Sequence, residues 1–276
     1  MIMAEKAKPW YKRWWAITIF VLIGLIVIGV LLTDEEDQIS QDALSDTGDF
    51  KVVYSPVKNQ DNLEYERIFK EAYIFDGMAE GLNSELILPY NVIINLTECG
   101  EENAFYDPNT KQIVMCYELM DHFAKVFYDY SENDTDLGIA ILNSMFFVFY
   151  HEVGHMVVDI YDLPATGNPE DNADQVSTLI LLGADIEGVN ALLNGANWFF
   201  IKSEEGNIEE SAFSDIHSPD KRRYYNILCW IYGSDPENAE SLITEWGLPE
   251  DRALGCEEEY NRMSNSWNRL LSPYLK

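Results

Sequence analysis

Positive charge is scarce in this chain of 276 residues, which contains 18 Lys and Arg against 48 Asp and Glu. The formal net charge of −30 at pH 7 argues against a nucleic-acid partner and against binding to anionic membrane surfaces. The acidic residues are spread through the chain, which is typical of a solvated acidic surface rather than of a binding tail. A salty habitat and a cationic substrate are both compatible with this excess of negative charge.

Cysteine occurs only four times, and no two cysteines have the Cys-x-x-Cys spacing, which argues against a structural zinc site. Four cysteines allow three pairings, of which we expect the nearest-neighbour one, Cys99 with Cys116 and Cys229 with Cys256. Two disulfide bonds would fit an exported protein, whereas in a reducing cytosol all four would be buried free thiols. Internal repeats and low-complexity tracts are absent as well.

One nearly unbroken apolar run is present, at residues 14–32, and its 19 uncharged residues are long enough to cross a hydrocarbon core as a helix. Basic residues precede the run and acidic residues follow it, so the positive-inside rule places residues 1–13 in the cytoplasm and the rest outside. A cleaved signal peptide is the alternative, but the run is too long and no Ala-x-Ala site follows it. We therefore expect a single-pass membrane protein with a signal anchor at 14–32, an acidic linker at 33–57 and one domain at 58–276.

Histidine also occurs only four times, and two of the four belong to the motif His151-Glu152-Val153-Gly154-His155. On an α-helix, residues i and i+4 lie on one face, so both imidazoles can ligate one Zn²⁺ while Glu152 reaches a water beside it. Five residues can match by chance, so the context decides. Apolar residues at three- and four-residue spacing over 137–160 predict a long buried helix around the motif.

A second helix is predicted from Pro169 to Gly183, because Asn168 is a favourable N-cap and Pro169 a favourable first helical residue. Catalytic zinc needs a third protein ligand, and Glu170 lies just inside this helix. Asp174, one turn further along, would accept a hydrogen bond from a zinc-bound histidine. The alternative makes Asp174 or Asp171 the ligand and leaves Glu170 as a charge favoured by the helix dipole.

The combination of His151, Glu152 and His155 with Glu170 and Asp174 resembles the gluzincin group of zinc peptidases. A closer resemblance, over roughly residues 60–270, is to a family of metallopeptidases whose function is uncharacterised. The matching segments lie at 103–108, 116–119, 151–155, 162–175 and 217–236. The metzincin pattern is not met, because Val158 and Tyr161 stand where that pattern needs Gly and His.

This resemblance implies a catalytic Zn²⁺ held by His151, His155 and Glu170, with Glu152 as the general base. It also makes His217 a donor to the oxyanion of the tetrahedral intermediate, with a loop or capping role as the alternative. Tyr224 and Tyr225 could donate to the same oxygen, although tyrosines more commonly pack. We expect His122, which lies among acidic and aromatic residues, to be structural.

The expected fold is a mainly helical α+β domain of the zincin type, with a small antiparallel sheet beside the zinc helix. Strands are predicted at 90–96 and 112–117, forming a hairpin that turns at 106–109. Zinc peptidases of this type bind extended substrate along a strand edge, which implies this hairpin as the peptide-binding strand. Besides the two helices of the site, helices are predicted at 63–82, 118–130, 190–201, 219–232, 236–246 and 249–271.

The sequence therefore predicts a membrane-anchored, extracytoplasmic zinc peptidase that acts on peptides or proteins. Two alternatives belong to other classes. One is a non-catalytic binding or scaffold module on the cell surface that keeps zinc for stability. The other is a hydrolase of small amides or esters with an enclosed pocket, which would not cleave long peptides.

Overall fold

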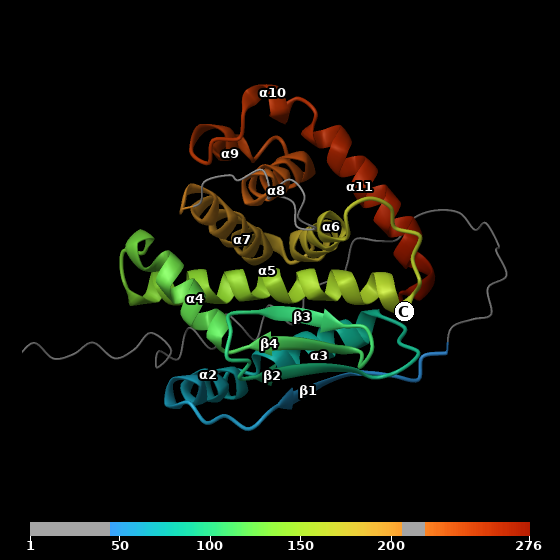
Figure 1. Ribbon diagram of the computed structural model, residues 1–276. Coiled ribbons are helices and arrows are strands. Elements are labelled where there is room, and N and C mark those ends of the chain that lie inside the picture. Colours follow the sequence, from blue (N-terminus) through green and yellow to red (C-terminus); the bar gives the residue numbers. More distant parts are fainter. Residues whose placement is uncertain (1–44, 206–218) are drawn as a thin grey trace, which may run out of the picture.

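The computed structural model describes residues 45–205 and 219–276 (Figure 1). The predicted membrane segment at 14–32 and the candidate His217 lie outside the described residues. Within the described part, one helix, α5 (Asp134–Ile160), is long and apolar enough to span a membrane, and most of it is buried inside the domain.

The sheet contains four strands in the order β1-β2-β4-β3. The first three of these run parallel, and β3 pairs antiparallel with β4 at the edge. The expected antiparallel pairing of 90–96 with 112–117 is therefore wrong: these segments are parallel neighbours, and the sheet is mixed. The strands are β1 (Phe50–Tyr54), β2 (Val92–Thr97), β3 (Ala104–Asp107) and β4 (Gln112–Cys116).

Two short strands account for the difference from the predicted sheet. The connection between β2 and β4 is long enough to contain β3, only four residues long, which forms the true hairpin with β4. At the other edge, β1 lies inside the segment 33–57 for which we expected a linker, so ordered structure begins before residue 58.

Helix α5 lies between the sheet and a layer of later helices (Figure 1). It packs against α4, α6 and α7 as well as against β3 and β4, which explains why its sequence is apolar almost all round. The Asn133 side chain caps its start by accepting from the backbone N–H groups of Thr135 and Asp136. The later helices are α6 (Pro169–Leu182), α7 (Asp185–Glu205), α8 (Asp220–Ser234), α9 (Glu240–Thr244), α10 (Glu250–Ala253) and α11 (Cys256–Leu271).

Three of the predicted helices are divided or shortened in the structure, and the one predicted at 190–201 is longer, as α7. The one predicted at 63–82 is two helices, α2 (Gln60–Glu71) and α3 (Ile74–Glu85), because Tyr73 between them has a left-handed φ of 56°. The segment 236–246 is helical only in α9, and 249–271 is divided into α10 and α11. The remaining early helix, α4 (Glu118–Phe127), continues as a 3₁₀ turn to Tyr130.

Both predicted disulfide bonds are confirmed. Cys99–Cys116 joins the connection after β2 to the end of β4, and Cys229–Cys256 joins α8 to the first residue of α11.

The last residues of the chain return to the start of the folded domain. Leu275 forms an isolated β-bridge with Leu86, and the backbone N–H of Lys276 donates to the carbonyl of Glu85. The Lys276 ammonium lies 2.7 Å from an Asp46 carboxylate oxygen.

Candidate metal centre

Two helices bring the candidate ligands together, and a glycine lets them approach. Gly154 in α5 faces Ala173 in α6 so closely that a Cβ at this position would lie 2.7 Å from the Ala173 Cα. Only glycine fits there without moving one backbone. The fourth residue of the motif thus allows α6 to place Glu170 beside the two histidines of α5.

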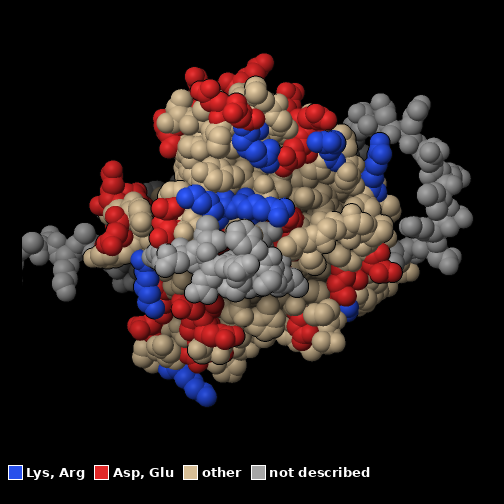
Figure 2. Space-filling model, turned by 45° about the horizontal axis from the view of Figure 1, so that its top comes forward, with Lys and Arg blue, Asp and Glu red and all other residues tan. Residues whose placement is uncertain are grey.

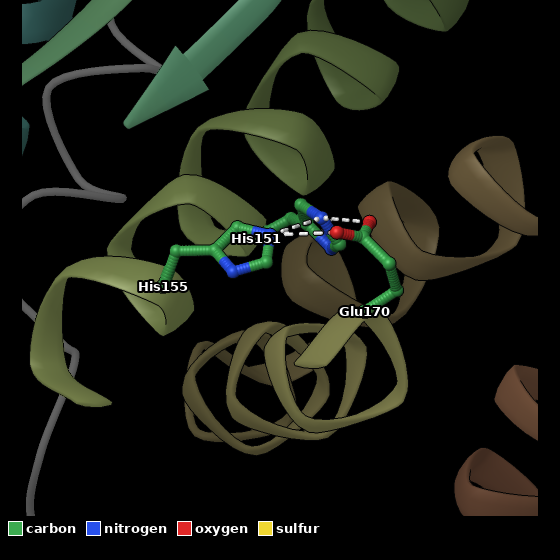
Figure 3. Close-up of side chains that lie close together, drawn as sticks. All are labelled: His151, His155 and Glu170. Atoms are coloured by element: carbon green, nitrogen blue, oxygen red, sulfur yellow. Dashed lines mark hydrogen bonds and ion pairs between the residues drawn. The ribbon is translucent and has the colours of Figure 1, made fainter. Parts of the chain in front are cut away.

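The three candidate ligand groups converge on one point (Figure 3). The two Nε2 atoms of His151 and His155 are 3.2 Å apart. Glu170 places Oε2 at 3.2 Å from the first of them and Oε1 at 3.3 Å from the second. Ligand atoms bound tetrahedrally to zinc at ordinary bond lengths lie about 3.3–3.5 Å apart. These spacings fit three corners of such a site.

The chemistry of this donor set also fits a cation. The Nδ1–H of His151 donates to Asp174 at 2.8 Å, and its Nε2 lies 3.2 Å from the Glu170 carboxylate. Burial lowers the pKa of His151, but the hydrogen bonds that its ring donates to the Asp174 and Glu170 carboxylates raise it by more, to about 9. Burial likewise raises the pKa of Glu170, while His151 and His155 bring it well below its usual range. All of these groups favour positive charge at this point, as a metal ion would supply it.

The candidate general base lies beside this point and is held by the sheet. Glu152 is buried, and its Oε2 accepts a hydrogen bond of 2.8 Å from the backbone N–H of Tyr106 in β3. Burial raises the pKa of this carboxyl above the usual range. The Tyr106 hydroxyl donates to Asp159, four residues after His155, so β3 is fastened to α5 at two points.

A cavity of about 960 Å³ opens onto these residues. Its lining includes the three candidate ligands and Glu152, together with residues of β3, α4, α7 and α8. This volume is within the range of ordinary ligand-binding clefts.

A family model described as "Putative metallopeptidase", named DUF4344, matches residues 54–271 of the chain. The chain belongs to the DUF4344 family. No curated protein and no solved structure matches it. The candidate metal centre and the cavity both lie inside the segment that the family model covers.

In this DUF4344 protein, Asp174 does not lie beside the third ligand position but behind His151. Its two carboxylate oxygens accept hydrogen bonds of 2.6 and 2.7 Å from the Arg223 guanidinium, which lies over the Phe199 ring. Burial raises the pKa of Asp174, but the charges and hydrogen bonds of Arg223 and His151 together lower it by more, to below its ordinary value. Asp171, the other alternative ligand, forms an ion pair with Arg222 at the surface.

No role was predicted for Arg223, because its partner Asp174 lies 49 residues away along the chain. The available sign was its spacing: it precedes Ile227 and Ile231 by four and eight residues, so it occupies the buried face of α8. An arginine at such a position needs an anionic partner.

The other sequence candidates have different places in this family member. The hydroxyl of Tyr224 donates to the backbone carbonyl of Trp246, and the Tyr225 ring packs against the Tyr224 ring, so neither tyrosine contributes to the cavity lining. His122, which we expected to be only structural, lines the cavity and contacts Glu102 and Trp198.

Proposed function

We propose that this protein is a zinc-dependent peptidase with His151, His155 and Glu170 as metal ligands and Glu152 as general base. One observation supports this most directly: three side chains that could hold a metal ion and a buried carboxylate line the same cavity. Zn²⁺, when bound, supplies a Lewis acid that polarises a carbonyl and lowers the pKa of a water.

In this proposal, Glu152 accepts a proton from the attacking water and passes it to the nitrogen of the leaving amine. The hydrogen bond from the Tyr106 amide holds one carboxylate oxygen, which leaves the other to exchange the proton. The raised pKa of the buried carboxyl suits a group that must take up and release a proton near neutral pH. Arg223 and Asp174 hold His151 in one tautomer and one orientation. His217 would donate to the carbonyl oxygen as negative charge develops on it.

The free edge of β3 is the proposed binding strand for an extended peptide. Neither β2 nor β4, to which the predicted hairpin pointed, is an edge strand, because each pairs with a strand on both sides. Ala104, Phe105 and Tyr106 of β3 line the cavity instead. The backbone N–H groups of Ala104 and Tyr106 already donate to the side chains of Asn103 and Glu152, so an added strand of substrate would bind by donating its own N–H groups to β3 carbonyls.

The test compares the full-length wild-type protein, Glu152→Gln and His151→Ala, all in detergent. We expect one zinc per chain and chelator-sensitive peptide hydrolysis for the wild type. Glu152→Gln should retain zinc and lose turnover, whereas His151→Ala should lose both. Peptide cleavage by Glu152→Gln at the wild-type rate would disprove the base. Zinc without cleavage of any peptide, small amide or ester would favour a binding module instead.

We further propose that residues 14–32 anchor the protein in a membrane with the domain on the extracytoplasmic side. The two disulfide bonds support this side, because such bonds persist in oxidising compartments. Protease added to intact cells should digest the domain, and alkaline carbonate should leave the protein in the membrane pellet. Protection from protease in intact cells but not in lysed cells would contradict the proposed orientation.

A further inference from the structure

An unbroken series of ring contacts extends from the metal centre along one side of the cleft. All five rings border the cavity and form an aromatic wall that ends at His122; Phe147 and Phe199 are buried within it, whereas Trp198 and His122 are half-buried. The contacts, given as distances between ring centroids, are His151–Phe147 at 6.4 Å, Phe147–Phe199 at 5.8 Å, Phe199–Trp198 at 4.9 Å and Trp198–His122 at 6.0 Å.

The charged side chains of the cleft are almost all paired. Asp159 lies 2.6 Å from the Lys111 ammonium, and Asp220 lies 3.8 Å from that of Lys202. Two further carboxylates belong to the metal centre. Among the described residues, Glu102 at the far end of the aromatic wall is the one cleft carboxylate with neither a cationic partner nor a place at the metal.

The partner of Glu102 is a neutral histidine. The indole N–H of Trp198 donates to His122 Nε2 at 3.0 Å, and an indole can only donate, so this nitrogen has no proton. His122 therefore donates its Nδ1–H to Glu102 at 2.7 Å without neutralising it. The Glu102 side chain is 55% exposed, so its charge is accessible from the cleft.

We propose that Glu102 is a specificity-determining residue that selects substrates with a lysine or arginine side chain. This inference rests on the proposed peptidase function. The methylene stem of such a side chain would lie along Trp198 and His122, the half-buried end of the aromatic wall, and its cationic end would meet the Glu102 carboxylate. Lys202 already uses this end of the wall in the same way, because its ammonium lies over Trp198 and beside Asp220. The net charge of −30 would steer cationic peptides toward the cleft.

The first experiment uses the full-length protein and peptides that differ at one position, which holds Lys, Arg, Leu or Glu and is moved along the peptide. At one position the wild type should prefer Lys and Arg over Leu by about two- to fivefold in kcat/KM, the effect of one partly exposed ion pair. Glu102→Gln, which still accepts the hydrogen bond from His122, should remove this preference. Glu102→Lys should replace it with a preference for Glu.

The matched control is Glu101→Gln, which removes the same charge one residue away. Glu101 is exposed and does not line the cavity. This variant should retain the preference for Lys and Arg. An unchanged preference in Glu102→Gln would overturn the inference, because Glu102 would then not determine the preference. An equal loss of preference in Glu101→Gln would also overturn it, because the preference would then come from the overall negative charge of the protein.

A binding measurement keeps this inference separate from the proposed function. Fluorescence anisotropy would give the Kd of labelled Lys and Leu peptides for zinc-loaded Glu152→Gln and for the double variant Glu152→Gln/Glu102→Gln. The second change should weaken binding of the Lys peptide about two- to fivefold and leave binding of the Leu peptide unaffected. Equal effects on both peptides would refute the role of Glu102. A wild type that cleaves no peptide would refute the peptidase function and leave this comparison decisive for Glu102.

Discussion

Asp174 connects the buried charged side chains near the candidate metal centre, because it accepts hydrogen bonds from both Arg223 and His151. It lies in the core with Arg223, and both side chains have lost their water. Removing two charges from water is costly, and only close, well-directed hydrogen bonds offset that cost. Here each carboxylate oxygen accepts from the guanidinium, and one also accepts from His151. The orientation of a candidate metal ligand is thereby coupled to an ion pair in the core.

Arg223→Leu should therefore act on both stability and metal affinity. It removes the guanidinium that pairs with the buried Asp174 carboxylate, at an expected cost of about 3–5 kcal/mol in the free energy of unfolding. The metal affinity should fall about 10- to 100-fold, because Asp174, which orients His151, is no longer held in place. Denaturant unfolding and competition with a zinc-binding dye would measure the two effects. Arg222→Leu is the control: its exposed pair with Asp171 should contribute less than about 1 kcal/mol.

The raised pKa of His151 predicts how the metal-free protein responds to pH. Because its pKa of about 9 exceeds the unfolded value of 6.5, its stabilising contribution is complete below pH 6.5 and lost as pH rises through 9. Chelator-treated protein should lose about 3 kcal/mol of unfolding free energy over this range. Zinc affinity should change in the opposite direction, since protons compete with the metal. Equal stability of the metal-free protein at pH 6 and pH 9.5 would contradict the shift.

At the level of single residues, the sequence predicted the side chains of the motif and of the helix that follows it. It missed the groups that reach the site from other parts of the fold. The spacing of the motif and the capping residues before Glu170 anticipate the observed convergence, while the ligand roles stay a prediction. Arg223 and the Tyr106 amide reach the site from α8 and β3, whose positions depend on packing that local periodicity does not encode.

The contact of α5 with α6 shows at the level of elements why the motif contains glycine. The Cβ of any other residue at 154 would lie within 3 Å of the α6 backbone, so the two helices would have to separate. Separation moves Glu170 away from the histidines, because that side chain lies in the first turn of α6.

Gly154→Ala should therefore destabilise the domain by about 1–3 kcal/mol and weaken zinc binding. Gly77→Ala is the matched control, since its Cβ would meet only the Tyr73 ring, at 3.7 Å. That change should stabilise α3 by about 0.5–1 kcal/mol through helix propensity. Thermal unfolding and zinc titration of both variants would measure these effects. A Gly154→Ala protein with wild-type zinc affinity would show that α6 tolerates the displacement.

The elements themselves were predictable to different degrees. The mainly helical character and the two helices of the site follow from strong periodicity and good caps. The strand pairing of the sheet cannot be predicted in this way. The apolar residues of β2 and β4 fit a parallel pair as well as an antiparallel pair, and only the path of the chain between the two strands distinguishes them. The break between α2 and α3 lies at Tyr73, which has a left-handed φ. Because this residue is not glycine, the sequence gives no sign of the break.

Charge is the property that belongs to the whole molecule. Acidic side chains form several separate groups on the face seen in Figure 2, with lysine and arginine side chains between some of them. Among the described residues, ion pairs engage only some of the acidic side chains, and a net charge of −30 repels itself in the compact state.

Salt should therefore stabilise the folded protein by screening this repulsion. Between 20 and 300 mM NaCl, we expect the free energy of unfolding in urea to rise by on the order of 1 kcal/mol and then to level off, since screening within about 10 Å is then complete. A gain that continues in proportion to salt would indicate a general solvent effect instead. A decrease would show that the surface ion pairs outweigh the repulsion.

The contact of Lys276 with Asp46 has a consequence for the order of the chain. Because the two ends of the described fold meet, a few linking residues could join 276 to 46 without crossing the cleft. A circularly permuted chain that begins instead at an exposed surface turn, such as the one at Gly247, should fold to the same domain. The order in which the backbone connects the elements can then be changed, whereas the contacts between the elements must be kept.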